Sequence, residues 1–451
     1  MMRSRSYLGL LLVAGALGAP IAAVAYWFLK LTDLVQHWTY TSAPEALGFS
    51  SEPVWWPVLP LAVAGLCVGM IIRYLPGHGG ESPAEGFKAG GVVPPVGLPG
   101  IFLAAVASIG LGAVLGPEAP LIALGGGLAY LAVWLARRDV PRETAAVIAA
   151  TGSFAAISTL LGTPLAGAFL LLEASGLGGT LATAVLLPGL LAAGVGALIF
   201  TGLDALTGYG TFSLAIPSLP AASAPTLAEF GWALAIGVAA AGLSAGLRWL
   251  ALRVRDGVGR RLVPVTTLLG LVMAGLAILY AQLTGHPASN VLFSGQAALP
   301  GLIDHSADYT VGALVLLLVC KGLAYVAALS GFRGGPTFPA MFIGAAGGIA
   351  LSHLPGLSLV AGVAMGLAAM TVGMLRLPMS AVLLTTLFLG SDGFAVMPLV
   401  IVATVVCYLT ANRLAAEPQP VAAPAPESSP APPVPRQPLS SPVRRVDRVS
   451  D

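Results

Sequence analysis

The chain has 451 residues, of which 57% are hydrophobic and only 9% are charged, and its mean hydropathy is +0.90. This composition predicts a protein that crosses a membrane several times. The apolar runs are too long for barrel strands, so a β-barrel is excluded and we expect an all-α polytopic membrane protein. The formal net charge of +2 does not indicate nucleic acid as a partner.

The apolar segments are expected to be helices, and several have only about a dozen residues between Gly or Pro breaks. A bilayer core takes roughly 20 helical residues, so these short segments predict broken and re-entrant helices. Such helices are tolerated at membrane depth only where protein or a watery cavity covers them, which favours a transporter interior. The segments are 7–29, 55–76, 98–115, 118–136, 143–161, 164–175, 180–203, 227–252, 263–284, 309–330, 338–352, 357–375, 378–390 and 394–413.

Charges in the connections alternate in sign along the chain, which predicts the orientation in the lipid bilayer. The acidic loops, with Glu45, Glu52, Asp204, Glu229, Asp304, Asp308 and Asp392, should face outward. The positive-inside rule makes the basic connections cytoplasmic, so we expect a multi-pass plasma-membrane protein with both termini in the cytoplasm. The basic positions are Arg3, Arg5, Arg73, Lys88, Arg137, Arg138, Arg142, 248–261 and Arg413.

The composition changes abruptly near residue 415 to Pro, Ala and Ser. Such a segment cannot bury a core, so we expect a transmembrane domain at 1–414 and a disordered cytoplasmic tail at 415–451. The three cysteines and five histidines show no metal-ligand spacing, and we expect neither a metal site nor a cofactor.

A ten-residue stretch occurs twice, beginning with Gly116-Pro-Glu-Ala-Pro120 and with Gly335-Pro-Thr-Phe-Pro339, and both copies end in glycine. A Pro-led short segment and a further Pro-containing helix follow each copy, at Pro164 and Pro188 and at Pro378 and Pro398. This order predicts a duplication with halves at about 55–247 and 262–413, divided by the basic stretch.

Each Gly-Pro pair has a physical meaning at the start of a helix. Glycine permits the tight turn, and proline at the first helical position loses an amide hydrogen that had no partner there. The remaining free amides and the positive end of the helix dipole attract an anion. Two such starts aimed at one point would form an anion site inside the membrane.

The stretch Gly110-Leu-Gly-Ala-Val-Leu-Gly-Pro-Glu-Ala-Pro120 resembles the segment of the CLC chloride channels and proton/chloride antiporters that ends in Gly-Arg-Glu-Gly-Pro. Blocks 150–173 and 330–339 also resemble the family, and the similarity covers roughly 55–410. The resemblance implies an inverted-repeat homodimer with one anion pathway in each subunit. It places Glu118 at the gating-glutamate position.

The sequence also departs from the family pattern. Where the family has Gly-Ser-Gly-Ile-Pro, this chain has Gly77-His-Gly-Gly-Glu-Ser-Pro83, so Gly80 takes the position of the serine and a hydroxyl must come from Ser82 or be missing. The family's tyrosine follows its last membrane helix, and Tyr408 does not match it. The resemblance implies anion contacts at Gly80, Ser82, Gly116, Ala119, Thr337 and Phe338.

Two acids are candidates for gating or proton transfer. Glu118 at a helix start can occupy the anion site as a tethered competitor and leave when it is protonated or displaced; the alternative is a helix-capping acid. Glu173 matches the first acid of a Glu-Glu pair that many antiporters of the family carry, but Ala174 replaces the second. It could be a proton relay or the partner of a nearby cation, and Lys321 and Arg376 could attract anions or snorkel.

The main hypothesis is therefore transport of a small inorganic anion, most simply chloride, with proton coupling left open. A fluoride exporter of the same superfamily is the nearer alternative. An intramembrane lipid-processing enzyme is the alternative from a different class, but the sequence has no His-Glu-x-x-His and no paired membrane aspartates, so we do not expect an enzyme.

Overall fold

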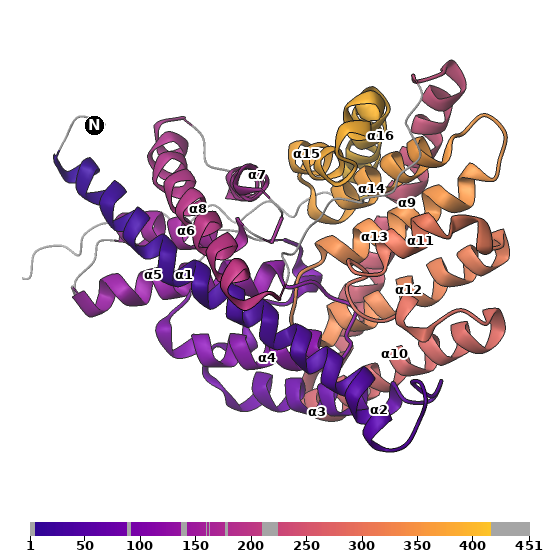
Figure 1. Cartoon of the computed structure of the whole chain (residues 1–451), viewed down its shortest axis with the longest axis horizontal. Coiled ribbons are helices and arrows are strands. Elements are labelled where there is room, and N and C mark those ends of the chain that lie inside the picture. The colour runs from indigo at the N-terminus through magenta and orange to yellow at the C-terminus, as the bar shows by residue number, and fades with distance from the viewer. Residues whose placement is uncertain are drawn as a thin grey trace, which may run out of the picture. The chain divides into compact units, whose positions relative to one another are not determined.

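The computed structural model describes residues 5–87, 92–136, 142–158, 160–161, 163–175, 179–209 and 224–415 (Figure 1). The helices in these ranges belong to one compact unit, Met1–Leu414. The tail predicted from residue 415 onward lies outside the described residues apart from Ala415, as do Arg3, Lys88, Arg137 and Arg138.

The described part of the chain is built from helices and contains no β-strand. The first set is α1 (Arg5–His37), α2 (Ala43–Ala46), α3 (Val58–Tyr74), α4 (Leu98–Gly110), α5 (Glu118–Ala136), α6 (Arg142–Ile157), α7 (Pro164–Ser175) and α8 (Gly179–Thr207). The second set is α9 (Leu227–Val258), α10 (Leu262–Thr284), α11 (Leu299–Asp304), α12 (Val311–Gly331), α13 (Thr337–Ser352), α14 (Leu359–Leu375), α15 (Pro378–Phe388) and α16 (Ser391–Leu414).

Each predicted apolar segment coincides with a helix, and the prediction of broken helices is confirmed. Seven helices of the described ranges are long and apolar enough to cross a membrane, and others have only 10–17 residues. The short helices α7 and α15 begin at Pro164 and Pro378, where proline suits the first helical turn. The short helices α2 and α11 and the π-helical turn Trp38–Ser42 were not predicted, because they lie between the long apolar runs.

The duplication is visible in how the helices contact one another. Helix α1 packs against α4, α6 and α8, and α9 packs against α12, α14 and α16 in the same order (Figure 1). We therefore call α1–α8 the first unit and α9–α16 the second. The basic stretch at 248–261, which was expected to divide the halves, includes the end of α9. The predicted halves, at about 55–247 and 262–413, stay a prediction.

Three contacts join an element to its own counterpart in the other unit. Helix α3 packs against α10, α7 packs against α15, and Gly116 pairs with Gly335. An element can meet its own counterpart in this way when the two units are related by a two-fold rotation. The two copies of the Gly-Pro stretch therefore lie together at the centre of the repeat.

Glycine lets the helix after each Gly-Pro stretch approach its neighbour closely. A Cβ atom at Gly344 of α13 would collide with the carbonyl oxygen of Gly366 in α14 and lie 2.9 Å from the Cβ of Met370. In the other unit, a Cβ atom at Gly125 of α5 would lie 2.5 Å from the carbonyl oxygen of Gly152 in α6. These two glycines are the last residues of the two copies of the ten-residue repeat. In both copies the final glycine allows the close packing of two helices.

Gly344→Ala should lower the free energy of unfolding by about 1–3 kcal/mol, since the new methyl group must push two closely packed helices apart. Thermal unfolding of the purified protein in detergent measures the effect. Gly347→Ala is the matched control, because a Cβ atom there would meet only Leu318, at 4.0 Å. Equal effects of the two substitutions would contradict the packing argument.

Candidate functional site

The two Gly-Pro stretches are joined by a pair of backbone hydrogen bonds. The amide of Gly116 donates to the carbonyl of Gly335 at 2.8 Å, and the amide of Gly335 donates to the carbonyl of Gly116 at 2.6 Å. Helices α5 and α13 begin two residues beyond this bridge. The bridge therefore holds both helix starts beside one another in the interior.

The carboxylate of Glu118 occupies the start of the other unit's helix. Although Glu118 is the first residue of α5, its Oε1 accepts a hydrogen bond from the backbone amide of Thr337, the first residue of α13, at 2.5 Å. The side chain is completely buried. A hydrogen bond to a charged group contributes about 1.5–3 kcal/mol, and the positive end of the α13 dipole adds to it. The Glu118 carboxylate thus occupies a helix start, the kind of place at which proteins bind anions.

Two glycines leave the space for this carboxylate. A Cβ atom at Gly335 would overlap the Glu118 carboxyl group, and a Cβ atom at Gly116 would overlap its Oε2 and lie 2.8 Å from the ring of Phe338. Neither glycine has a positive φ, so the requirement is one of space and not of backbone conformation. Phe338 is buried and packs its ring against Gly116.

Two polar atoms beside this hydrogen bond are buried without a partner among the described residues. They are Oε2 of Glu118 and the hydroxyl oxygen of Thr337. Burying a polar group without a hydrogen bond is costly, and such groups call for an explanation such as a ligand or ion. Both atoms lie at the start of α13, next to the hydrogen bond between Glu118 and the Thr337 amide.

The start of α5 differs from that of α13. The amide of Gly116 is used in the bridge, the amide of Leu121 donates to the carbonyl of Pro117 at 3.0 Å, and Pro120 has no amide hydrogen. Ala119 keeps a free amide position in the first turn and lines a cavity. Of the two predicted contacts on this helix, Ala119 is therefore available to a ligand through its backbone, and Gly116 is not.

The cavity at the start of α5 has a volume of about 360 Å³. Its walls come from the loop after α3, from the start of α5, and from the residues just before α13. They include Gly80, Ser82, Ala119, Arg333, Gly334 and Pro336.

The loop after α3 supplies a hydroxyl group to this cavity. The amide of Gly80 donates to the carbonyl of Gly77 at 2.9 Å, so the predicted backbone contact from Gly80 is already occupied within the loop. The hydroxyl oxygen of Ser82 is buried and has no partner among the described residues. Ser82 is therefore a candidate for the hydroxyl group that the sequence analysis expected either from this residue or not at all.

Within the described part of the chain, the hydrogen bonds of the Glu173 carboxylate go to a helix start and neither to a cation nor to Glu118. Its Oε1 accepts from the amide of Met379 at 2.9 Å, and its Oε2 accepts from the amide and the hydroxyl of Ser380 at 2.7 and 2.6 Å. These donors belong to the first turn of α15. The expected cation partner is thus replaced by a helix start, which attracts a carboxylate for the same reason.

The two candidate cations also have structural contacts. Lys321 is completely buried, and its Nζ donates to the carbonyls of residues 290–292 at 2.9–3.2 Å and lies 4.3 Å from the centre of the Phe342 ring. It therefore does not snorkel. Arg376 donates to the Asn412 side chain and to the carbonyl of Ala411, which fastens the end of α14 to α16.

Tyr325 is a site residue that the sequence analysis missed. This completely buried tyrosine of α12 donates its hydroxyl hydrogen to the carbonyl of Pro336 at 2.7 Å, immediately before α13. It fixes the turn that presents the Thr337 amide. The signal for this role in the sequence is a tyrosine in the helix that precedes the second Gly-Pro stretch.

The fold and the buried, helix-terminal site define a membrane transport protein with broken helices. The sequence profile described as "Voltage gated chloride channel" matches residues 64–412. This chain belongs to that family.

Individual relatives agree with this assignment. The chain is 30% identical over 357 residues to "Putative ion-transport protein YfeO" of Escherichia coli O1:K1, an alignment that covers 78% of this chain and 81% of the relative. The structure is similar to that of a slow cyanobacterial Cl-/H+ antiporter, with a TM-score of 0.72, 20% identity, and coverage of 91% of this chain and 95% of the other. It is also similar to a CLC-type fluoride/proton antiporter, with a TM-score of 0.68, 22% identity, and coverage of 90% and 96%.

Gly335→Ala should destabilise the protein by about 1–3 kcal/mol because its methyl group competes with the Glu118 carboxyl for space. Glu118→Ala removes the three atoms that lie nearest to that methyl group. In a double-mutant cycle followed by thermal unfolding, Gly335→Ala should therefore cost less in the Glu118→Ala background. Additive effects would show that the carboxylate does not lie between the two glycines.

Proposed function

We propose that this protein moves small inorganic anions across the membrane, with chloride as the main substrate, and that Glu118 gates the pathway. The observation that carries the proposal is the hydrogen bond from the Thr337 amide to the fully buried Glu118 carboxylate. A carboxylate and a halide are both anions that a helix start can hold. The position of Glu118 is therefore that of a tethered competitor.

In this mechanism an anion enters the cavity and meets the Ser82 hydroxyl and the Ala119 amide. It cannot advance to α13 while the Glu118 charge repels it and occupies the Thr337 amide. Protonation removes that charge, and a sufficiently concentrated anion displaces the carboxylate directly. Either event frees the Thr337 amide and its unpartnered hydroxyl for the anion.

Neutral donors suit transport better than a fixed cation at this point. A helix start is equivalent to roughly half a positive charge, which compensates for part of the water that an anion loses. A full positive charge would bind the anion more strongly and slow its departure. Conduction requires binding that is favourable enough for entry and weak enough for release.

Proton coupling would rest on Glu118 in the first place. Glu173 was a second candidate, but proton transfer through it would require the release of three hydrogen bonds that hold α7 to α15. We therefore assign Glu173 a structural role in the proposed mechanism. Recording pH during anion flux distinguishes a coupled antiporter from a passive pathway.

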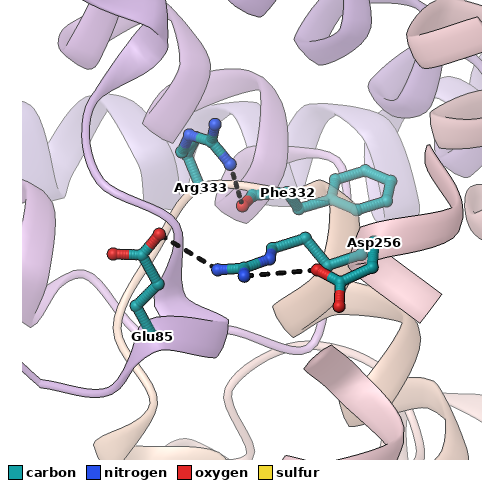
Figure 2. A network of polar contacts seen from close by, with 5 residues as sticks. Glu85, Asp256, Phe332 and Arg333 are labelled. Atoms are coloured by element: carbon teal, nitrogen blue, oxygen red, sulfur yellow. Dashed lines mark hydrogen bonds and ion pairs between the residues drawn. The ribbon is translucent and has the colours of Figure 1, made fainter. Parts of the chain in front are cut away.

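The cavity should open toward the cytoplasm. Beside it, Arg255 of the basic stretch at the end of α9 pairs with Glu85 of the loop after α3 at 3.0 Å (Figure 2). Basic connections lie on the cytoplasmic side by the positive-inside rule. The same rule places both termini of this plasma-membrane protein in the cytoplasm.

The α7–α15 face should be covered by a second copy of the chain. These helices have 12 and 11 residues, too few to cross the hydrocarbon, and they expose Leu165, Phe169 and Met379. Short helices at membrane depth need protein around them. A two-fold axis through this face would bury the exposed side chains in a homodimer.

Light scattering in a mild detergent should find a dimer. Combining Leu165→Gln with Met379→Gln should shift the equilibrium toward monomer, since both substitutions place polar groups in the proposed contact. Leu283→Gln on α10 is a control, because Leu283 is also exposed but lies on another face. A monomeric wild type, or an equal effect of the control, would contradict the proposed interface.

Glu118→Gln should make anion flux largely independent of pH, whereas wild-type flux should rise as the pH falls and the gate is protonated. The measurement is chloride efflux from proteoliposomes over a pH series. Glutamine keeps the size of the side chain but cannot titrate. An unchanged pH dependence would contradict the gating role, and no efflux of any anion from wild type would contradict the transport function.

Glu52→Gln is the matched control for that experiment. Glu52 lies in the loop between α2 and α3, and burial raises its pKa from 4.5 to about 7. It therefore titrates within the pH series over which chloride efflux is measured. The Glu52→Gln substitution should leave the pH dependence of flux intact.

Parallel measurements with fluoride compare the proposal with the fluoride alternative, since a fluoride exporter would move fluoride much faster than chloride.

A further inference from the structure

Arg333 brings a positive charge to the cavity without closing it. It lies between α12 and α13, two residues before the Gly116–Gly335 bridge, and it lines the cavity together with Ala119 and Ser82. Among the described lining residues, it is the only arginine or lysine. The loop just before the second Gly-Pro stretch therefore contributes a cation to the cavity at the start of α5.

The Arg333 side chain is held in place by uncharged groups. Its Nη1 donates to the carbonyl of Phe332 at 3.1 Å and its Nε lies 3.4 Å from the carbonyl of His78 (Figure 2). Its backbone amide donates to the Ser108 hydroxyl at 3.0 Å. These contacts orient the guanidinium, and none of the carboxylates in the described ranges forms a hydrogen bond or ion pair with it.

Two acidic residues near the cavity, Glu85 and Glu81, oppose the positive charge of Arg333 to different extents. Glu85 acts on Arg333 electrostatically, but its hydrogen bond goes to Arg255, which also contacts Asp256 (Figure 2). Arg255 thus compensates for part of the negative charge of Glu85. Glu81 also lines the cavity and brings an opposing negative charge.

The sequence around α5 makes this placement significant. The CLC motif that Gly116–Pro120 resembles has an arginine after its first glycine, and this chain has Pro117 there. Proline starts the helix well but carries no charge. In this chain the arginine at the cavity beside the start of α5 is Arg333, and the bridge brings its loop to that place.

We propose that Arg333 recruits the transported anion into the cavity and that Glu81 opposes it, so that these two charges set the anion concentration at which transport is half-saturated. This proposal rests on the proposed function of the same pathway. Arg333 acts before the anion reaches Glu118. It therefore tunes access to the pathway and is separate from the gate.

The test uses initial chloride efflux from proteoliposomes of the full-length protein over a series of chloride concentrations, with gluconate keeping the ionic strength constant. Arg333→Gln should raise the half-saturating chloride concentration by about three- to tenfold, as expected for removing one charge several ångströms from the anion. Arg333→Lys should restore most of the affinity. Glu81→Gln should change the half-saturating concentration in the opposite direction.

Arg253→Gln is the matched control. Arg253 belongs, like Arg255, to the basic stretch at the end of α9. Its side chain is exposed, with its guanidinium 5.3 Å from the centre of the Trp249 ring. Removing it changes the surface charge and should leave the half-saturating concentration near the wild-type value. Thermal unfolding of each variant identifies any loss of folded protein.

The outcomes separate this proposal from the transport function. If wild type moves no anion, the proposed function fails. If wild type transports and Arg333→Gln saturates at the wild-type concentration, recruitment by Arg333 is refuted and transport stands. If Arg333→Gln and Arg333→Lys are equally impaired, the role of Arg333 is one of structure and not of charge.

Discussion

The structure depends on a carboxylate from one repeat unit binding the helix start of the other. Glu118 and Thr337 are corresponding residues of the two Gly-Pro stretches, and the Glu118 side chain reaches the Thr337 amide. Glu173 repeats the arrangement at α15, again from the first unit to the second. The two units thus have similar backbones but different chemistry, since the acids belong to the first and the amides that bind them belong to the second.

This asymmetry divides the work between the two helix starts. The start of α13 is filled by a group that can lose its charge, and the start of α5 opens to a cavity through Ala119. The glycines at 116 and 335 make the first arrangement possible by leaving room for the carboxylate. The cavity thus lies at the start of α5, and the carboxylate lies at the start of α13.

Periodicity and proline positions predicted the helices well, because apolar length and helix-start chemistry are local properties. The sequence also identified Glu118 and the two Gly-Pro stretches. It did not show that the Gly80 and Gly116 amides are consumed by local hydrogen bonds or that Glu173 caps α15. Those facts depend on which backbone groups meet after folding, as does the contact of Tyr325 with Pro336.

The most direct test of this account is the location of bromide by anomalous X-ray diffraction from crystals of wild type and Glu118→Ala. Bromide replaces chloride and can be placed without ambiguity. The account predicts a bromide ion at the Thr337 amide in Glu118→Ala, at the position that the carboxylate occupies in wild type. If the start of α13 holds no bromide when the carboxylate has been removed, Glu118 does not compete with an anion there and the central claim is wrong.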